Sequence, residues 1–383
     1  MAALFWLSAL LLFYVYIGYP LITAGLARLE PKEEYATSDL PAVTLIIAAY
    51  NEEAVLEKKL QNTAELNYPP DKLQVMVAAD GSTDATAAIA EAFTGRKVLL
   101  SYSKERRGKV AAVARAAKKA TGEIIVLSDA NNLYPMYALK SLVQPFADTR
   151  VGAASGAKHV EKEGDSLSAS EGLYWKYESW IKRNESRLHT CTAAAGEILA
   201  VRRELFPQFP ADVVNDDFYI LLHVLRSGFR VAYVPAAESW ERVSQSAEDE
   251  VKRRARISAG RFQAVSRSLG WLPWNDPLAV WQIISHKYLR LAIPFAMLAA
   301  LISNISLVFF NPQKRNWATW LLAAQVVFYL LAALGRRFKF KGIGKALYLP
   351  AFLVDSNLAT LRGFFRQVRK GQDAAWEKAK RRT

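Results

Sequence analysis

Acidic residues follow three short apolar runs of the sequence, each at the point where the run ends. Glu52 comes just after AVTLIIAAYN, Asp80 closes LQVMVAAD, and Asp129 closes EIIVLSD. Such runs, separated by polar helical stretches, predict a mostly parallel sheet with helices on both faces. Ligands bind at the carboxyl ends of the strands in sheets of this kind, so we expect the acids to share one site. Helix capping, the simpler explanation, fits Ser82 or Asp84 alone.

The residue types at these strand ends favour a metal ion and a phosphate-bearing ligand. Asp129 and Asn131 are two positions apart in an extended segment, so both side chains can face one ion. Carboxylate and amide oxygens suit Mg²⁺ or Mn²⁺, which bind through one or two carboxylates and phosphate oxygens. Gly108 and Lys109 open a predicted helix between two of the acidic strand ends. A helix N-terminus with a lysine beside it suits a diphosphate.

Four motifs, in this order and at this spacing, resemble the nucleotide-binding half of family 2 inverting glycosyltransferases. They are AAYNEE, ADGSTD, RRGKVAAVARA and LSDANN, and the resemblance covers about residues 40–265. It implies a GT-A type α/β domain with a Rossmann-like sheet. Together with the apolar segments described below, it implies the membrane-integrated branch, which includes hyaluronan, chitin and cellulose synthases and bacterial exopolysaccharide transferases.

The resemblance also implies roles for individual residues. Glu52 and Asp80 would hold the uracil and ribose of the donor, Lys109 would lie near the diphosphate, and Asp129 would begin the Asp-x-Asp metal motif. Asn131 stands where relatives carry the second acid of that motif. Because an amide oxygen is a poorer ligand than a carboxylate, the metal would rest mainly on Asp129, phosphates and water.

The catalytic base is expected in VVNDDFYILL, which is similar to the segment that carries it in the family. Asp217 takes the matching position, next to Asp216. Inversion requires a carboxylate that deprotonates the acceptor hydroxyl as this attacks opposite the leaving nucleotide. A neighbouring acid such as Asp216 raises the pKa of such a base. The alternative is an acid pair favoured at a helix N-terminus by the helix dipole.

A basic segment, KRRARISAGRF, stands where relatives carry Gln-x-x-Arg-Trp. Arg253 replaces the Gln, Arg256 matches the Arg, and Ile257 replaces the Trp. We assign both arginines to the nucleotide-sugar site, where Arg256 would clamp the diphosphate through its guanidinium. The missing Trp removes a stacking platform for the acceptor sugar and weakens the case for a long-chain processive synthase.

Four further residues are candidates on the acceptor side. Ser155, Gly156 and Gly196 lie in segments that resemble the acceptor-side strands of the family and would allow close approach of a sugar. Close packing between strands is an equally good explanation for these small residues. Trp376 lies in the basic tail, where relatives keep a Trp near the nucleotide; the alternative is a tail that binds the membrane surface.

Apolar segments on either side of the predicted α/β domain indicate an integral membrane protein. Residues 3–27 carry no charge, and two further apolar blocks lie at 288–310 and 317–335. The expected parts are a transmembrane helix at 1–30, the GT-A domain at 40–265, an interfacial segment at 268–287, a transmembrane hairpin at 288–335, an amphipathic interfacial helix at 344–366, and a basic cytoplasmic tail at 367–383. The basic flanks place the catalytic domain and the C-terminus in the cytoplasm, with a bacterial inner membrane as the expected location.

Composition excludes some kinds of site. The 383-residue chain has a net charge of +14 and one cysteine, Cys191, so an intrachain disulfide and a cysteine-based zinc site are excluded. Its four histidines are scattered without metal-ligand spacing. The charge is compatible with nucleic acid, an anionic membrane or a phosphate-bearing substrate.

The sequence therefore predicts a membrane-bound, metal-dependent inverting glycosyltransferase that uses Mg²⁺ or Mn²⁺. The expected donor is a nucleotide-diphosphate sugar, with UDP as the nucleotide, and the acceptor is a glycan or a lipid-linked molecule of cell-surface or exopolysaccharide synthesis. An alternative is a single-addition transferase that acts on a polyprenyl phosphate or glycolipid. The alternative from another class, a membrane-anchored nucleic-acid-binding module, conflicts with the acids at the strand ends, so no nucleic-acid partner is expected. The oligomeric state stays open.

Overall fold

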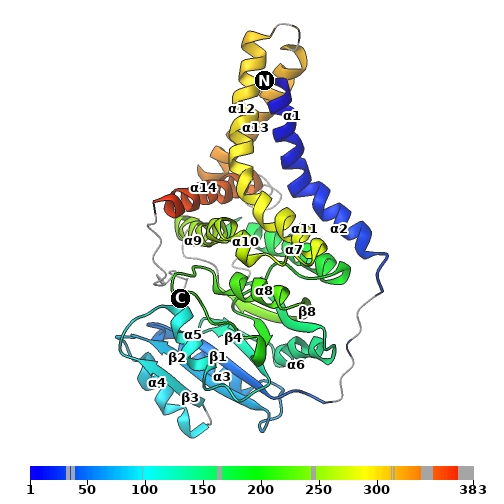
Figure 1. Ribbon diagram of the computed structural model, residues 1–383. Helices are drawn as coiled ribbons and strands as arrows, with labels where there is room; N and C mark the ends of the chain where they lie inside the picture. Colours follow the sequence, from blue (N-terminus) through cyan, green and yellow to red (C-terminus); the bar gives the residue numbers. More distant parts are fainter. Residues whose placement is uncertain are drawn as a thin grey trace.

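The computed structural model describes residues 1–31, 35, 39–96, 98–161, 166–242, 247–311, 313, 315–337 and 348–369. These residues form an α/β lobe and a bundle of long apolar helices that extends from one end of it (Figure 1).

The described part of the lobe contains an eight-stranded mixed sheet in the order β3-β2-β1-β4-β7-β6-β8-β5. The strands are β1 (Val43–Ala49), β2 (Leu73–Asp80), β3 (Val98–Ser103), β4 (Ile124–Asp129), β5 (Asn132–Leu133), β6 (Val151–Val160), β7 (Leu199–Arg202) and β8 (Arg230–Glu241). β1 pairs in parallel with both β2 and β4, and β2 pairs in parallel with β3. β7 runs antiparallel between β4 and β6, which makes the second half of the sheet mixed.

Helices cover both faces of this sheet because its central strands are apolar on both sides. In β1, Leu45 and Ile47 belong to the core on one face, whereas Ile46 and Ala48 belong to the core on the other. The first core is completed by helices α3 (Glu53–Ala64), α4 (Thr86–Ala92) and α6 (Ala138–Val143). The second is completed chiefly by α5 (Lys109–Ala117) and α8 (Asp216–Arg226). The predicted α/β domain is thus confirmed.

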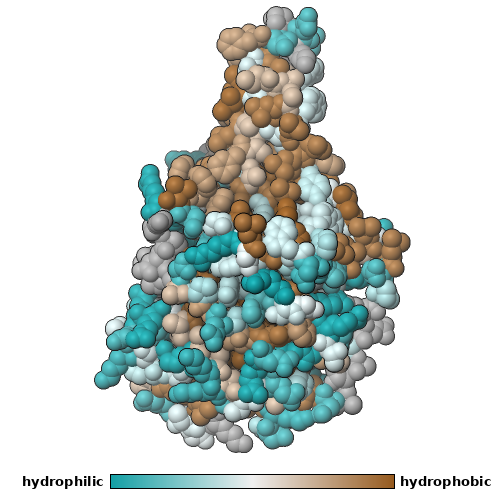
Figure 2. Space-filling model, in the orientation of Figure 1, coloured by the Kyte–Doolittle hydropathy of each residue, from teal (hydrophilic) through white to brown (hydrophobic). Residues whose placement is uncertain are grey.

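Three helical stretches are long and apolar enough to cross a membrane, judged by their length and composition. They span Ala2–Ala27, Pro277–Phe310 and Asn316–Arg337. The corresponding elements are α1 (Ala2–Phe13), α2 (Tyr19–Ala27), α11 (Pro277–Ile283), α12 (Leu289–Phe310) and α13 (Arg315–Arg337), with a wider helical turn at Tyr14–Gly18 and another at Ile284–Tyr288. In Figure 2 apolar side chains gather over this bundle, whereas the lobe surface is largely polar.

The segments between lobe and bundle are also helical. They are α7 (Ser166–Leu188), α9 (Ala247–Ser266), α10 (Ser268–Trp271) and α14 (Tyr348–Val368). α14 packs against α9 and α13 and lies across the base of the bundle (Figure 1). Pro277 begins a helical run that continues into α12, so part of the predicted interfacial segment at 268–287 is continuous with a candidate span. The interfacial positions of this segment and of α14 stay predictions, and the tail beyond residue 369 lies outside the described residues.

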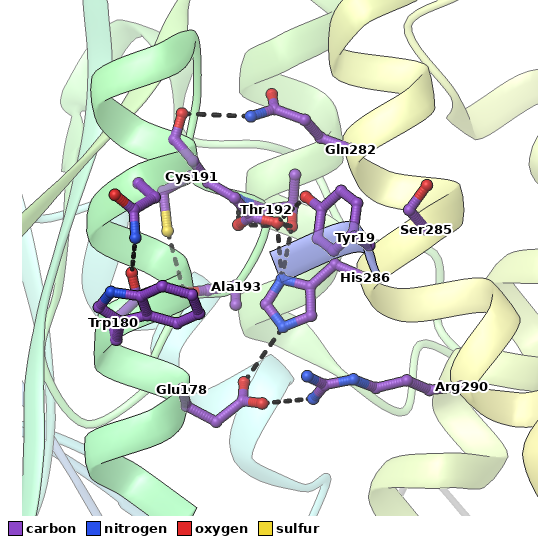
Figure 3. A network of polar contacts seen from close by, with 12 residues as sticks. Tyr19, Glu178, Trp180, Cys191, Thr192, Ala193, Gln282, Ser285, His286 and Arg290 are labelled. Carbon is purple, nitrogen blue, oxygen red and sulfur yellow. Dashed lines mark hydrogen bonds and ion pairs between the residues drawn. The ribbon is translucent and has the colours of Figure 1, made fainter. Parts of the chain in front are cut away.

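A buried polar network joins the lobe to the apolar helices (Figure 3). His286 lies between two carboxylates of α7, with Nδ1 2.7 Å from Glu185 and Nε2 3.2 Å from Glu178. Tyr19 of α2 donates a hydrogen bond to Glu185, and Arg290 of α12 forms an ion pair with Glu178. Breaking a buried pair of this kind strands a charge, so the network fixes α2 and α12 on the lobe.

Candidate active site

The carboxyl ends of β2, β1 and β4 lie side by side because β1 pairs in parallel register with both neighbours. Ala48 is opposite Asp129, and Ala49 is opposite Ala79, the residue before Asp80. Asn51 follows with a φ of 52°, a conformation that asparagine tolerates, and its side chain accepts a hydrogen bond from the Thr83 amide at 2.8 Å. The sheet therefore brings the predicted acidic strand ends to one edge.

Asp80 fixes the loop that leads into α5. Its Oδ2 accepts hydrogen bonds from the amides of Arg107 at 3.0 Å and Gly108 at 2.6 Å. Gly108 has a φ of 92° and Gly81 has a φ of 64°. A Cβ on Gly81 would lie 2.8 Å from the Cβ of Arg106, so glycine permits both the backbone turn and the close approach of the loop. The start of α5 is thereby held beside the strand ends.

A narrow cavity of about 10 Å³ lies between this loop and the end of β1. The Arg106 guanidinium lies over the Tyr50 ring, 4.1 Å from its centre, at the edge of that cavity. Glu52 is buried at the start of α3, and its amide donates a hydrogen bond to Thr86 Oγ1 at 2.7 Å. Of the two residues assigned to uracil and ribose by resemblance, Asp80 lines this cavity, whereas Glu52 is buried beside it at the start of α3.

Lys109 lies between two carboxylates at the N-terminus of α5. Its Nζ is 2.7 Å from Asp129 Oδ1 and 3.7 Å from Asp216 Oδ2. Burial, the largest effect, acts to lower the pKa of Lys109, but Asp129 and Asp216 outweigh it and the pKa is raised. Burial likewise acts to raise the pKa of Asp129, but Lys109 outweighs it and the pKa is lowered. Lys109 is charged and Asp129 is ionised at neutral pH.

Asp217 lies at the N-terminus of α8, next to this cluster. Burial, reinforced by the neighbouring carboxylate of Asp216, raises its pKa to about 6. Its Oδ1 accepts a hydrogen bond from its neighbour's amide, that of Phe218, at 2.7 Å. Gly196 faces it closely, since a Cβ on Gly196 would lie 3.3 Å from the Asp217 Cβ. A half-buried carboxylate with a pKa near 6 is suited to accept a proton near neutral pH.

Lys158 and Glu197 form a second ion pair that the sequence did not single out. Lys158 Nζ is 2.8 Å from Glu197 Oε1 and also pairs with Glu241. Burial acts to raise the pKa of Glu197, but Lys158 outweighs it and lowers the pKa, while the charge of Asp129 acts to raise it. The pair therefore lies within electrostatic range of Asp129 and its partner Lys109. The sequence alone could not indicate it, because the partners of Lys158 come from segments far apart in the chain.

Buried oxygens in the site fit a divalent cation. Asp129 Oδ1, Asp216 Oδ2 and Glu197 Oε1 accept no aligned hydrogen bond within the described part of the chain, although each contacts a lysine ammonium. This set of oxygen donors is the kind that Mg²⁺ and Mn²⁺ prefer. No group of three or more His, Cys, Asp or Glu side chains gathers as a metal cage in the described residues.

Several predicted residues lie elsewhere in the lobe. Ser155 is fully buried in β6, where its Oγ accepts a hydrogen bond from the Ala195 amide at 3.0 Å. A Cβ on Gly156 would lie 2.4 Å from the Ala237 carbonyl oxygen, which agrees with close packing between strands. Arg253 pairs with Glu250 at 2.8 Å on α9.

Arg256, Asn131 and Trp376 complete the predicted set. Arg256 is half-buried on α9, and Asn131 is half-buried just after β4. The following residue, Asn132, is fully buried and donates hydrogen bonds to the Glu197 carbonyl at 3.0 Å and to Ser239 Oγ at 2.7 Å. Asn132 therefore anchors the segment and leaves Asn131 as the amide nearer to solvent. Trp376 lies outside the described residues.

A sheet of this order, with parallel strands β1 to β4, of which β2 and β4 end on acidic residues, and helices on both faces, has the GT-A type fold. A family model described as "Glycosyltransferase like family 2" matches residues 41–260, and the chain belongs to this family. The predictions of family and fold are confirmed.

Two curated relatives and one solved structure are similar to this chain. The probable glycosyltransferase YdaM of Bacillus subtilis is 24% identical over 261 residues, which cover 62% of this chain and 60% of the relative. The poly-β-1,6-N-acetyl-D-glucosamine synthase of Staphylococcus aureus is 22% identical over 245 residues, which cover 62% and 59%. The aligned part thus spans about three fifths of each curated relative. A mannosyltransferase of Pyrobaculum calidifontis, solved with GDP-Man and Mn²⁺, is 25% identical with a TM-score of 0.74 and covers 96% of this chain and 100% of that one.

Proposed function

We propose that the chain is a membrane-bound inverting glycosyltransferase that moves a sugar from a nucleotide-diphosphate donor to a glycan or lipid-linked acceptor. The observation that carries the proposal is Asp217, a half-buried acid with a pKa near 6, placed beside the ion pairs that Lys109 forms with Asp129 and Asp216. Membership of the family and the relation to an exopolysaccharide synthase support the reaction class.

The donor would lie along the parallel edge of the sheet. Its base and ribose would lie beside Tyr50 and Asp80 once the loop that carries Arg106 moves aside, since the cavity there measures only about 10 Å³. Its diphosphate would approach Lys109 at the start of α5. Asp129 and Asn131 would hold Mg²⁺ or Mn²⁺, which would neutralise the charge of the leaving diphosphate. UDP is the nucleotide expected from the sequence. The solved relative is a complex with GDP-Man, which makes GDP-sugars necessary in any test.

Asp217 would act as the general base. As the acceptor oxygen attacks the anomeric carbon, its proton passes to the Asp217 carboxylate, and the bond from that carbon to the diphosphate oxygen breaks with its electron pair on the diphosphate. Attack opposite the leaving group inverts the configuration. Gly196 leaves the face of Asp217 open, because a side chain there would contact the carboxyl group.

The three candidate spans support a reaction at a membrane. Their apolar surface has no soluble partner in the described structure, and a bilayer would cover it (Figure 2). The basic flanks favour a cytoplasmic lobe, where nucleotide sugars are made.

A donor screen tests the proposal. The purified full-length protein in neutral detergent should release nucleotide diphosphate from at least one member of a panel of radiolabelled UDP- and GDP-sugars. EDTA should stop the release and Mn²⁺ should restore it. Absence of turnover across the panel, with protein that stays folded and monodisperse, would contradict the proposal.

A further inference from the structure

A second cavity, separate from the nucleotide cleft, lies where the lobe meets the apolar helices. Its volume is about 420 Å³. Its lining residues come from five segments: the turn after α1, α7, α9, the start of α12, and α14. In Figure 1 these elements meet at the base of the bundle, at the level where the apolar surface of Figure 2 begins. We call this cavity the interface groove.

Buried donors around the interface groove lack acceptors. Trp175 Nε1, Arg254 Nη2 and Arg290 Nε are buried and make no hydrogen bond within the described ranges. All three residues line the groove, and they come from α7, α9 and α12 respectively. A buried N–H without an acceptor costs free energy, so three of them beside one cavity favour a ligand that only accepts hydrogen bonds, toward which these side chains would turn.

Positively charged side chains line the groove. Four arginines line it: Arg253, Arg254, Arg261 and Arg290. Glu250 forms ion pairs with the first two, and Glu178 forms one with the last. Burial, the largest effect, lowers the pKa of the Arg261 guanidinium, although nearby acids act against it. Positive charge therefore remains in excess, which fits an anionic ligand.

The other wall of the groove is partly apolar, beside the polar Ser356, Asn357 and Thr360 of α14. Leu349, Phe352 and Leu353 of α14 line it, together with Leu173 of α7 and Tyr16 of the first apolar helix. A free inorganic anion would gain nothing from this surface, whereas a hydrocarbon chain would bury it. The groove thus offers an anion site and an apolar surface side by side, as a lipid with a phosphate headgroup requires.

Two contacts connect the groove to the candidate active site. Arg261 lies within electrostatic range of Asp217, and the charge of each affects the pKa of the other. On the other side, Lys158 Nζ lies 5.3 Å from the centre of the Trp175 ring and 2.8 Å from Glu197. A headgroup in the groove would therefore lie on the side of the lobe that carries the proposed base.

We propose that the interface groove binds the phosphate group of a lipid-linked acceptor, with Trp175, Arg254 and Arg290 donating to the phosphate and the hydrocarbon chain lying against α14. This inference rests on the proposed function, since it names the class of acceptor that the glycosyltransferase uses.

Equilibrium binding tests the inference directly. The full-length protein in neutral detergent is titrated with radiolabelled C55 polyprenyl phosphate, with the uncharged C55 polyprenol, and with inorganic phosphate as a competitor. We expect the lipid phosphate to bind at least about tenfold more tightly than the polyprenol, since hydrogen bonds to a charged group contribute about that factor or more. Inorganic phosphate should compete only weakly, because it lacks the chain.

Two variants locate the binding site. Trp175→Phe removes the buried N–H and keeps an aromatic ring, and it should weaken binding of the lipid phosphate about tenfold. Because that N–H has no acceptor in the described structure, no hydrogen bond is lost, and the melting temperature should fall only by the loss of ring packing against Tyr174 and Lys158. Arg254→Gln removes a charge and should weaken binding by about tenfold or more. Trp180→Phe, on α7 but outside the groove lining, is the matched control and should bind as the wild type does.

The outcomes separate the two proposals. Equal binding of polyprenol and polyprenyl phosphate, or wild-type affinity in both groove variants, would overturn the lipid-phosphate site. Competition by inorganic phosphate at the affinity of the lipid would overturn the role of the chain. If the wild type hydrolyses a nucleotide sugar but binds no lipid phosphate, the proposed function stands and the acceptor assignment fails. If the wild type binds the lipid phosphate but turns over no donor, the lipid-phosphate site stands and the proposed function fails.

Discussion

A general base with a raised pKa gives an enzyme a particular pH dependence. Asp217 holds its proton below about pH 6 because burial and Asp216 disfavour its ionised form. We therefore predict that kcat/KM for transfer falls about tenfold for each pH unit below pH 6 and is constant from pH 7 to pH 8. The measurement is initial rate from pH 5 to 8, with melting temperature followed at each pH. A flat profile between pH 5 and 7 would remove Asp217 as the base.

The raised pKa of Asp217 also affects stability: activity rises with pH, whereas the free energy of unfolding falls. Asp217 in the folded protein binds its proton more tightly than an unfolded aspartate does, so folding loses stability as pH rises from about 4 to about 6. The difference between an ordinary pKa of 3.8 and about 6 corresponds to about 3 kcal/mol. Asp217→Asn should accordingly raise the melting temperature at pH 8 and have little effect at pH 4. A lower melting temperature at pH 8 would show that the ionised carboxylate stabilises the fold.

Asn131 offers a test of the metal assignment that does not depend on turnover alone. Restoring the acid of the family motif with Asn131→Asp should tighten Mn²⁺ binding, measured by calorimetry, or leave it unchanged, because a carboxylate is the better ligand. Asn184→Asp on α7 is a control outside the site and should not alter Mn²⁺ affinity. Weaker binding in Asn131→Asp, or full donor turnover of the wild type in EDTA, would contradict a metal at Asp129.

At the scale of elements, α9 fixes the position of the N-terminal end of α8. Asn215, which precedes α8, donates a hydrogen bond to the Ile257 carbonyl at 2.9 Å, and it lies against Gly260. Gln263 Nε2 donates to the Asp212 carbonyl at 2.7 Å. The position of Asp216 and Asp217 therefore depends on how closely α9 approaches this loop.

Gly260→Ala tests that dependence. The added Cβ would lie 2.5 Å from Asn215 Cγ, so the loop must shift, at a cost of about 1–3 kcal/mol. We predict a lower melting temperature and a reduced kcat with donor affinity nearly unchanged. Gly270→Ala, where no atom lies within 4 Å of the added Cβ, is the control and should be neutral. A Gly260→Ala protein as active as the wild type would show that α9 does not position the base.

How much the sequence predicted differs between elements. The strand ends at Asp80 and Asp129 could be predicted because apolar runs and polar helices alternate locally along the chain. The antiparallel β7 and the Lys158–Glu197 pair could not, because they depend on contacts between segments far apart in sequence. Ser155 and Gly156 show the same limit: small residues in a strand suit ligand approach or strand packing equally, and only the fold shows the strand contacts they make.

At the scale of the whole molecule, the arrangement of the apolar helices predicts which side of the membrane each end occupies. Three candidate spans with basic flanks predict that the lobe and the C-terminus lie on the cytoplasmic side. A cysteine introduced at Thr383 should then react with a membrane-impermeant thiol reagent only after permeabilisation. Cys191 is fully buried, so background labelling should be low. Labelling in intact cells would require another span, with α14 as the candidate.

The most direct test of the central claim compares transfer rate with nucleotide affinity in three variants. Asp217→Asn should lower transfer by about 10²-fold or more and leave UDP or GDP affinity, measured by calorimetry, close to that of the wild type, because only proton transfer is lost. Asp216→Asn should be milder, and Arg256→Ala should weaken nucleotide affinity by about 1–3 kcal/mol if it clamps the diphosphate. Full transfer activity in Asp217→Asn, with transfer abolished in Asp216→Asn, would contradict the assignment and move the base to Asp216.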